Sequence, residues 1–368
     1  MSIKNLIVGA GISGAVVARK IAEELGETVL VIDRKDHIAG NIYDYRDSKT
    51  GITIHKYGPH IFHTNIKEVW DFLSRFTEWH YFYLKPNAMI EGNPVTLPFN
   101  LTTLYEVFSP KMAERIEEKL ISKYGYGIKV PILDLKNNDD EDLKFLADYV
   151  YEHVFKNYTM KQWGLKPEEI DPSVTARVPV FISHDNRYFQ DKYQGIPLNG
   201  YTKMVEKILD HPNIKVKLNT DYKDINGDFE RIIYTGAIDE FFGYKYGELP
   251  YRSLVFDVRT INKEYFQKAV VTNYPNEYDF TRITEHKYFL DEKSEKTVIS
   301  IEYPQAFENG KNERYYPISN PDNQALYEKY KAEQPKNVYF IGRLGDYKYY
   351  NMDLAVERAL NFFKEEIK

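Results

Sequence analysis

The stretch IKNLIVGAGISGAVVARKIAEELGETVLVID, residues 3–33, decides the fold. It opens with a short apolar run and continues through the glycine turn GAGISG at 9–14 into a helical pattern at 15–25. A second apolar run at 28–32 leads directly into Asp33. Strand, glycine turn, helix, strand and acid in this order are typical of a βαβ unit that binds a dinucleotide.

Each glycine of this turn has a separate physical task. Gly9 permits the tight turn, Gly11 lets the backbone approach a pyrophosphate, and Gly14 lets the helix pack close to the strand. The N-terminus of the helix presents unpaired N–H groups to the phosphates, and Asp33 is placed to accept hydrogen bonds from a ribose. Ser13 lies inside the same turn, and we count it among the cofactor-binding residues.

The composition excludes several kinds of chemistry. The 368 residues include 32 Tyr and 21 Phe but no Cys, which rules out thiol nucleophiles, Cys-ligated zinc, iron–sulfur clusters and disulfide scaffolds. The net charge of -6 argues against a polyanion binder and therefore against a nucleic-acid partner, while a local basic pocket for phosphate stays compatible with it. Because genomic base composition also raises the tyrosine content, the tyrosine excess alone indicates no function.

The sequence carries no sign of membrane insertion or secretion. No stretch approaches the roughly 18 to 20 continuous apolar residues of a membrane span, and the chain runs from Met1 straight into an apolar strand. We therefore expect a soluble, cytoplasmic protein without a membrane span. Its length exceeds a comfortable single core and predicts two or three structural units.

The ten residues after Asp33, RKDHIAGNIY, indicate which dinucleotide is bound. They resemble the second glycine element of the glutathione-reductase-like FAD proteins, in which an acid, a basic residue and a pair of glycines line the adenosine and the pyrophosphate. Arg34, Gly40 and Asn41 occupy matching positions, and Ala39 replaces the first glycine of the pair. The resemblance implies that the cofactor is FAD.

The far end of the chain supplies the complement of this domain. A buried strand at 337–343 ends in glycine and is followed by a helical pattern at 352–364, and FAD domains of this class return at the C-terminus in the same way. We expect an α/β fold with a discontinuous Rossmann-like FAD-binding domain, an inserted helical bundle and a twisted antiparallel sheet domain. The predicted FAD-binding domain comprises 1–82, 210–243 and 317–368; the bundle comprises 98–185 with a mobile lid near 164–179; the sheet domain comprises 83–97, 186–209 and 244–316.

Six further motifs point to one family. They are YGPHIFHT at 57–64, NYTMKQWG at 157–164, NRYF at 186–189, YQGIP at 193–197, TRITE at 281–285 and GRLG at 342–345. Together they resemble the bacterial UDP-galactopyranose mutases along essentially the whole chain. The resemblance implies an FAD-dependent isomerase, usually a homodimer, that interconverts UDP-galactopyranose and UDP-galactofuranose for lipopolysaccharide, capsule or other cell-wall polysaccharide, with NADPH or NADH as the reductant.

A bound diphosphate needs fixed cations with directional donors, and arginine supplies both. By the family resemblance these cations are Arg177, in the predicted lid, and Arg282, although either arginine taken alone is better explained as a solvated surface charge. The resemblance also places His63 beside the flavin ring, so the expected catalytic residues are His63, Arg177 and Arg282. The expected substrate-binding residues are Tyr158, Trp163, Arg177, Tyr188, Asn273, Arg282, Tyr315 and Tyr349, with Tyr316 and Tyr350 as alternatives in register.

The remaining cofactor residues follow from the C-terminal motif. The resemblance places Arg343 at the FAD pyrophosphate and Met352 and Asp353 on the FAD side. Many family members have an Asp two residues after the tyrosine of this segment, where the present chain has Asn351. A role for that carboxylate therefore does not carry over to this chain.

The histidines His55, His60 and His63 also invite a metal hypothesis. Along a strand His60 and His63 would face opposite sides, and the neighbouring sequence offers no Asp or Glu partner. We therefore expect no metal, and we assign His60 to the support of His63 in the cofactor site.

The implied chemistry needs no protein nucleophile. By the resemblance, N5 of reduced FAD attacks the anomeric carbon and UDP leaves, while Arg177 and Arg282 stabilise the leaving charge. Two alternatives stay open: an FAD-dependent oxidoreductase that shares the terminal signatures, and a non-catalytic flavoprotein that binds nucleotide sugars. Acceptance of UDP-N-acetylgalactosamine cannot be read from the sequence.

Overall fold

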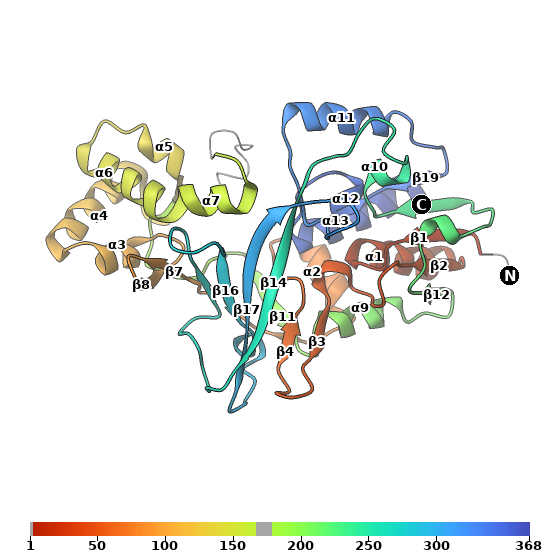
Figure 1. Cartoon of the computed structure of the whole chain (residues 1–368), viewed down its shortest axis with the longest axis horizontal. Coiled ribbons are helices and arrows are strands. Elements are labelled where there is room, and N and C mark those ends of the chain that lie inside the picture. Colours follow the sequence, from red (N-terminus) through yellow and green to blue (C-terminus); the bar gives the residue numbers. More distant parts are fainter. Residues whose placement is uncertain (1–2, 167–178) are drawn as a thin grey trace. The chain divides into compact units, whose positions relative to one another are not determined.

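The computed structural model describes residues 3–166 and 179–368, which divide into two compact units (Figure 1). The first unit comprises Met1–Phe82, Asp191–Tyr251 and Phe307–Lys368, and the second comprises Tyr83–Gln190 and Arg252–Ala306. The first unit is therefore discontinuous in sequence, and its first and last segments are the two ends of the chain.

A parallel sheet organises the first unit. In its described part five strands follow the order β12-β2-β1-β13-β19, and each neighbouring pair is parallel (Figure 1). The strands are β1 (Asn5–Val8), β2 (Val29–Ile32), β12 (Ile214–Lys217), β13 (Arg231–Tyr234) and β19 (Val338–Phe340). The apolar runs of β1 and β2, without alternation, suit this sheet because central parallel strands are covered on both faces. The edge strand β12 alternates and is largely exposed. The predicted α/β class with a Rossmann-like unit is confirmed.

Helices from both ends of the chain cover this sheet. Helix α1 (Ile12–Lys20) continues as a π-helical turn and ends at Gly26, whose φ of 66° gives a left-handed cap. Helix α13 (Met352–Phe362), near the C-terminus, contacts α1. The other elements of this unit are β3 (Asp44–Arg46), β4 (Thr53–His55), β5 (Phe62–Thr64), α2 (Lys67–Ser74), β6 (Trp79–His80), β11 (Tyr193–Pro197), α9 (Tyr201–Leu209), α10 (Ile238–Phe241), β18 (Tyr316–Pro317), α11 (Pro321–Lys331) and α12 (Gly342–Gly345).

Tyrosine fills much of the core beside this sheet. Tyr234, Tyr327, Tyr330 and Tyr347 are all buried in one cluster. The hydroxyl of Tyr347 donates to the carbonyl of Pro250 at 2.7 Å, and the hydroxyl of Tyr330 donates to a carbonyl at the same distance. A buried phenol is tolerated because its polar tip is hydrogen-bonded, so part of the tyrosine excess serves packing.

The second unit combines helices with a second sheet. Its helices are α3 (Leu101–Val107), α4 (Pro110–Tyr124), α5 (Ile132–Lys136), α6 (Glu141–Val150) and α7 (Lys156–Trp163). Its strands are β7 (Asn87–Ile90), β8 (Asn93–Thr96), β9 (Lys129–Pro131), β10 (Pro179–Phe181), β14 (Tyr251–Ile261), β15 (Val271–Asn273), β16 (Arg282–Glu285) and β17 (Thr297–Ala306). Strands β14-β17-β16-β15-β7-β8 are neighbours in this order, and β15 pairs with β7 in parallel, so the sheet is mixed.

The division into units differs from the predicted domains. The predicted bundle and the predicted sheet domain share one unit, and residues 244–251 and 307–316, predicted in the sheet domain, lie in the first unit. Residues 191–209, also predicted in the sheet domain, lie in the first unit as well. The reason is α9, which buries Met204, Val205 and Ile208 and contacts α1. Within residues 3–166 and 179–368, no helix has both the length and the apolar character that crossing a bilayer requires.

Candidate active site

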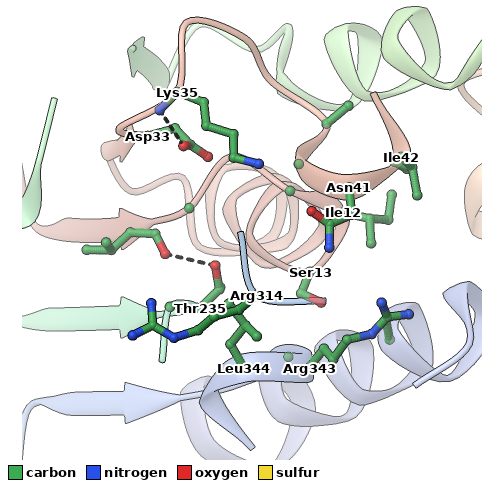
Figure 2. A pocket seen from close by; sticks show the side chains of 18 of the residues that line it. Ile12, Ser13, Asp33, Lys35, Asn41, Ile42, Thr235, Arg314, Arg343 and Leu344 are labelled. Atoms are coloured by element: carbon green, nitrogen blue, oxygen red, sulfur yellow. Dashed lines mark hydrogen bonds between the residues drawn. The ribbon is translucent and has the colours of Figure 1, made fainter. Parts of the chain in front are cut away.

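A pocket in the first unit lies where parallel strands end. Its walls include Gly9 after β1, Asp33 after β2, Thr235 after β13 and Gly342 after β19. Figure 2 shows Asp33 and Thr235 among the side chains that line it. All four positions follow the carboxyl end of a strand, which is where open α/β sheets bind their ligands.

The glycine turn leaves space for a ligand at one position and not at the others. A Cβ on Gly14 would lie 2.1 Å from the carbonyl oxygen of Gly9, and a Cβ on Gly9 would lie 2.0 Å from Oγ1 of Thr235. A Cβ on Gly11 would meet only the Cα of Gly40, at 3.8 Å. The surface over Gly11 is therefore open, and its backbone forms a cradle that fits a pyrophosphate.

The carboxylate of Asp33 is fixed by its own neighbourhood. Oδ2 accepts a hydrogen bond from the backbone N–H of Ala10 at 2.8 Å, and Oδ1 accepts one from the N–H of Lys35 at 2.9 Å. Each oxygen of a carboxylate has a second acceptor site. The side chain is thus oriented on the pocket wall with capacity for the hydroxyls of a ribose.

Arg343 is held on another wall of the pocket. Its Nη2 donates to the carbonyl of Tyr350 at 2.6 Å and its Nη1 to the carbonyl of Tyr315 at 3.3 Å. The guanidinium also lies 5.4 and 5.3 Å from the ring centroids of Tyr316 and Tyr349. A cation fixed in this way suits a phosphate because little conformational freedom is lost on binding.

The predicted cofactor residues gather at this pocket with two exceptions. Those that line it are Gly9, Gly11, Ser13, Asp33, Arg34, Gly40, Asn41, His60, Arg343 and Met352. Gly14 lies beneath it in the helix packing. Asp353 is buried in the first turn of α13, where its Oδ1 has no hydrogen-bond partner among the described residues.

Several residues of the pocket were not predicted. They include Lys35, Thr220, Thr235, Glu240, Glu313 and Arg314. Thr235 directly follows β13, so its place at the carboxyl end of an apolar run was the available signal. Lys35 lies within the segment RKDHIAGNIY that follows Asp33. The remaining side chains come from loops and a short helix without a local motif.

The predicted catalytic histidine lies on β5. Nδ1 of His63 lies 3.0 Å from Oδ2 of Asp191, and the other oxygen of that carboxylate accepts from Nδ2 of Asn65 at 2.8 Å. His63 is not part of the pocket lining, whereas His60 is, with its Nδ1 2.8 Å from the carbonyl of Gly58. The described residues contain no group of three or more side chains arranged to hold a metal ion.

The second unit places two predicted substrate residues side by side. Arg282 on β16 lies opposite Asn273 on β15 and opposite Glu302 on β17. Its Nε and Nη2 lie 2.8 and 2.7 Å from Oε2 of Glu302, whose other oxygen accepts from the hydroxyl of Thr281 at 3.2 Å. The side chain of Glu302 is 2% exposed and that of Arg282 is 22% exposed, so a buried carboxylate anchors a partly accessible guanidinium.

Helix α7 carries the predicted aromatic residues Tyr158 and Trp163 and is tied to the same sheet. Nζ of Lys161 donates to the carbonyl of Tyr274, next to β15, at 2.9 Å. Arg252 donates to two carbonyls at the C-terminal end of the helix at 2.9 and 3.0 Å. These contacts bring α7 to β14 and to the end of β15, whose Asn273 lies opposite Arg282 on β16.

The other predicted substrate residues are divided between the units. Tyr188 lies in the second unit, where its N–H donates to the carbonyl of Leu84 at 2.8 Å. Tyr315 is buried in the first unit, and Tyr349 stacks on Tyr316 with 5.4 Å between the ring centroids. Arg177 and most of the predicted lid lie outside the described residues.

The fold and the pocket define a dinucleotide-binding α/β protein, and comparison with known proteins gives its family. Residues 7–76 match the model of an NAD(P)-binding Rossmann-like domain, and residues 153–349 match that of UDP-galactopyranose mutase. The chain belongs to the UDP-galactopyranose mutase family, and it is an enzyme of the isomerase class.

Similar proteins agree with this assignment along the whole chain. A probable UDP-galactopyranose mutase of Klebsiella pneumoniae is 41% identical over 98% of this chain and 94% of its own length. A dTDP-fucopyranose mutase of Escherichia coli is 36% identical, covering 99% of this chain and 98% of that one. The crystal structure of a reduced UDP-galactopyranose mutase has the same fold, with a TM-score of 0.72 at 16% identity, 100% of this chain and 97% of that chain covered.

Proposed function

We propose that this chain interconverts UDP-galactopyranose and UDP-galactofuranose and that it does so with reduced FAD bound in the pocket of the first unit. The relative from Klebsiella pneumoniae, 41% identical and named as a probable UDP-galactopyranose mutase, supports this substrate. The observation that carries the proposal is the anchored Arg282, because a mutase must bind a diphosphate leaving group and an FAD oxidase need not.

The pocket suits FAD through its own residues. The open backbone at Gly11 and the first N–H groups of α1 receive the pyrophosphate, and Asp33 receives the ribose. Arg343 adds a fixed cation. Reduced FAD supplies the nucleophile for the anomeric carbon, which suits a chain without cysteine.

Arg282 binds the diphosphate and stabilises the charge that develops on it. Its contacts with Glu302 hold the guanidinium in one position, so the donors are already oriented when the substrate arrives. The amide of Asn273, opposite on the neighbouring strand, adds a neutral donor. Arg177, Tyr158 and Trp163 complete the proposed substrate site by the family match.

The test is a product assay. The protein is loaded with FAD, reduced with dithionite and incubated with UDP-galactopyranose, and UDP-galactofuranose is separated by chromatography. We expect furanose from the reduced protein, none from the oxidised protein, and a loss of most turnover in Arg282→Ala with the bound flavin spectrum unchanged. Near-normal turnover of Arg282→Ala would reject the role of this arginine.

The same assay separates the alternatives. Because one relative is named a dTDP-fucopyranose mutase, dTDP-fucopyranose is tested in parallel, together with UDP-N-acetylgalactosamine. If dTDP-fucopyranose is converted faster than UDP-galactopyranose, dTDP-fucopyranose is the substrate in place of the one proposed. Oxygen consumption with an amine and no furanose would indicate an oxidoreductase, and UDP binding without turnover would indicate a binding protein.

We place the reaction in the cytoplasm, with NADPH or NADH as the reductant and the product entering cell-surface polysaccharide such as lipopolysaccharide or capsule. We also propose a homodimer. The family match supports these assignments, and size-exclusion chromatography with light scattering tests the dimer.

A further inference from the structure

Five charged side chains on the pocket wall form a closed ring. Nη1 of Arg34 lies 3.0 Å from Oε1 of Glu240, and Nη1 of Arg314 lies 2.9 Å from Oε2 of the same glutamate. Nζ of Lys35 lies 3.3 Å from Oε2 of Glu313. Arg34 and Lys35 are neighbours in the chain, and so are Glu313 and Arg314. These two backbone links and the three ion pairs together form the ring. All five residues line the pocket, and we call them the charged ring.

The charged ring joins three segments that are distant in sequence. Arg34 and Lys35 follow β2, Glu240 lies on α10, and Glu313 and Arg314 precede β18. All three segments belong to the first unit. In the view of Figure 2, Asp33 and Thr235 lie between Lys35 and Arg314. Because Arg34 and Lys35 directly follow Asp33 in the chain, the ring begins beside the carboxylate that would hold a ribose.

The contacts of the ring differ in strength. Arg314 is 4% exposed, its guanidinium lies 4.3 Å from the ring centroid of Phe307, and its Nη2 is 3.1 Å from the hydroxyl of Tyr244. Glu313 is 47% exposed. Ion pairs with an exposed member contribute little and are screened by salt. Arg34, at 48%, is as exposed as Glu313, but its partner Glu240 is also held by Arg314. The Lys35–Glu313 pair has the longest separation of the three, 3.3 Å, and is thus the contact that opens first.

We propose that the charged ring is a clasp that retains the adenosine end of the bound dinucleotide, with Lys35–Glu313 as the contact that opens for release. The ring ties the segment after β2 to the segment before β18 beside Asp33. A ligand held at Asp33 leaves once this pair separates. The proposal rests on the proposed function only in taking FAD as the ligand.

The experiment measures how fast the holoenzyme releases FAD. Holoenzyme freed of unbound FAD is diluted, and the flavin in an ultrafiltrate is followed with time. Glu313→Gln keeps the size of the side chain and removes its charge. We expect release to accelerate about two- to fivefold, the range for an exposed ion pair. Release from the wild type should also accelerate in about 1 M NaCl, where the Debye length is about 3 Å, and the variant should respond less.

Two comparisons make the test specific. Glu230→Gln removes a surface pair with Lys4 at 3.4 Å, with 56% and 44% exposed side chains, outside the pocket, and it should release FAD at the wild-type rate. Lys35→Gln combined with Glu313→Gln should be no faster than the faster single variant, because both remove one contact. Equal release from the wild type and Glu313→Gln, or equal acceleration in Glu230→Gln, would overturn the clasp.

The outcomes separate this proposal from the proposed function. A wild-type protein that makes furanose while Glu313→Gln releases FAD at the wild-type rate rejects the clasp alone. A protein that follows the expected release rates but makes no furanose rejects the mutase function alone.

Discussion

Alanine at Gly11 and alanine at Gly14 should have opposite effects, because one glycine faces the ligand and the other faces the backbone of its own turn. Gly11 has a φ of -74°, which any residue adopts, and its added Cβ would meet only the Cα of Gly40 at 3.8 Å. The Cβ on Gly14 would lie 2.1 Å from the carbonyl oxygen of Gly9 and 3.0 Å from a methyl group of Ile7.

These distances determine the expected changes in stability and in FAD affinity. In the ligand-free protein Gly11→Ala should be neutral or stabilising by up to about 1 kcal/mol, because alanine restricts the unfolded chain. Its methyl group would occupy the open surface over Gly11, where the pyrophosphate of the proposed FAD would approach. Losing one hydrogen bond to a charged group costs about 1.5–3 kcal/mol, so FAD affinity should fall about ten- to a hundredfold. Gly14→Ala should destabilise the ligand-free protein by about 1–3 kcal/mol, because a backbone carbonyl cannot move aside as a side chain can.

The assay combines urea unfolding of the ligand-free protein with an FAD titration. Gly26→Ala is the control: it lies beyond the other end of the same helix, has open space around its Cβ and a φ of 66°, and should cost some stability without changing FAD affinity. Wild-type FAD affinity in Gly11→Ala, or wild-type stability in ligand-free Gly14→Ala, would refute the reasoning.

Two further predictions concern buried ionisable groups in the second unit. Arg282→Ala leaves the buried carboxylate of Glu302 without its cation and should lower the free energy of unfolding by about 3–5 kcal/mol. Adding Glu302→Gln to this variant should restore its stability in urea but not its formation of furanose. Burial lowers the pKa of His286 to about 3, so below about pH 6.5 only the unfolded chain takes up the proton. The free energy of unfolding should then fall by up to about 1.4 kcal/mol for each unit by which the pH decreases. In His286→Gln this contribution should be absent, which urea unfolding at pH 7.5 and pH 5.5 measures.

The fold of the first unit could be predicted because its signals are local. The glycine spacing at 9–14 fixes a turn between a strand and a helix, and Asp33 marks the end of the next strand. The predicted strand at 3–8 corresponds to β1, Asn5–Val8, and the predicted closing helix at 352–364 contains α13. Short-range sterics alone decide these features, so spacing in the sequence is enough to find them.

The limits of the sequence lie in contacts between distant segments. Residues 186–209 were predicted in the sheet domain, and no local pattern indicates that α9 packs against α1. Glu240 and Glu313 carry no motif, and only the fold brings them to Arg34 and Lys35. The partner of His63 was missed for the same reason: Asp191 follows it by 128 positions and reaches it through the pairing of β11 with β5.

The pairing of Arg282 with Glu302 is compatible with the proposed role of this arginine at a diphosphate. The carboxylate cancels part of the attraction for an anion, so the pair is not optimised for charge alone. Ordering a free arginine side chain on binding costs about 2 kcal/mol of rotamer entropy. Because the contacts of 2.8 and 2.7 Å with Glu302 already order Arg282 in the folded protein, this entropy is lost on folding and not on ligand binding. What the site gains is a guanidinium in a fixed plane. Lysine has the charge but not the fork, so it cannot satisfy Glu302 and the diphosphate in the same geometry, and the arrangement selects for arginine through its shape.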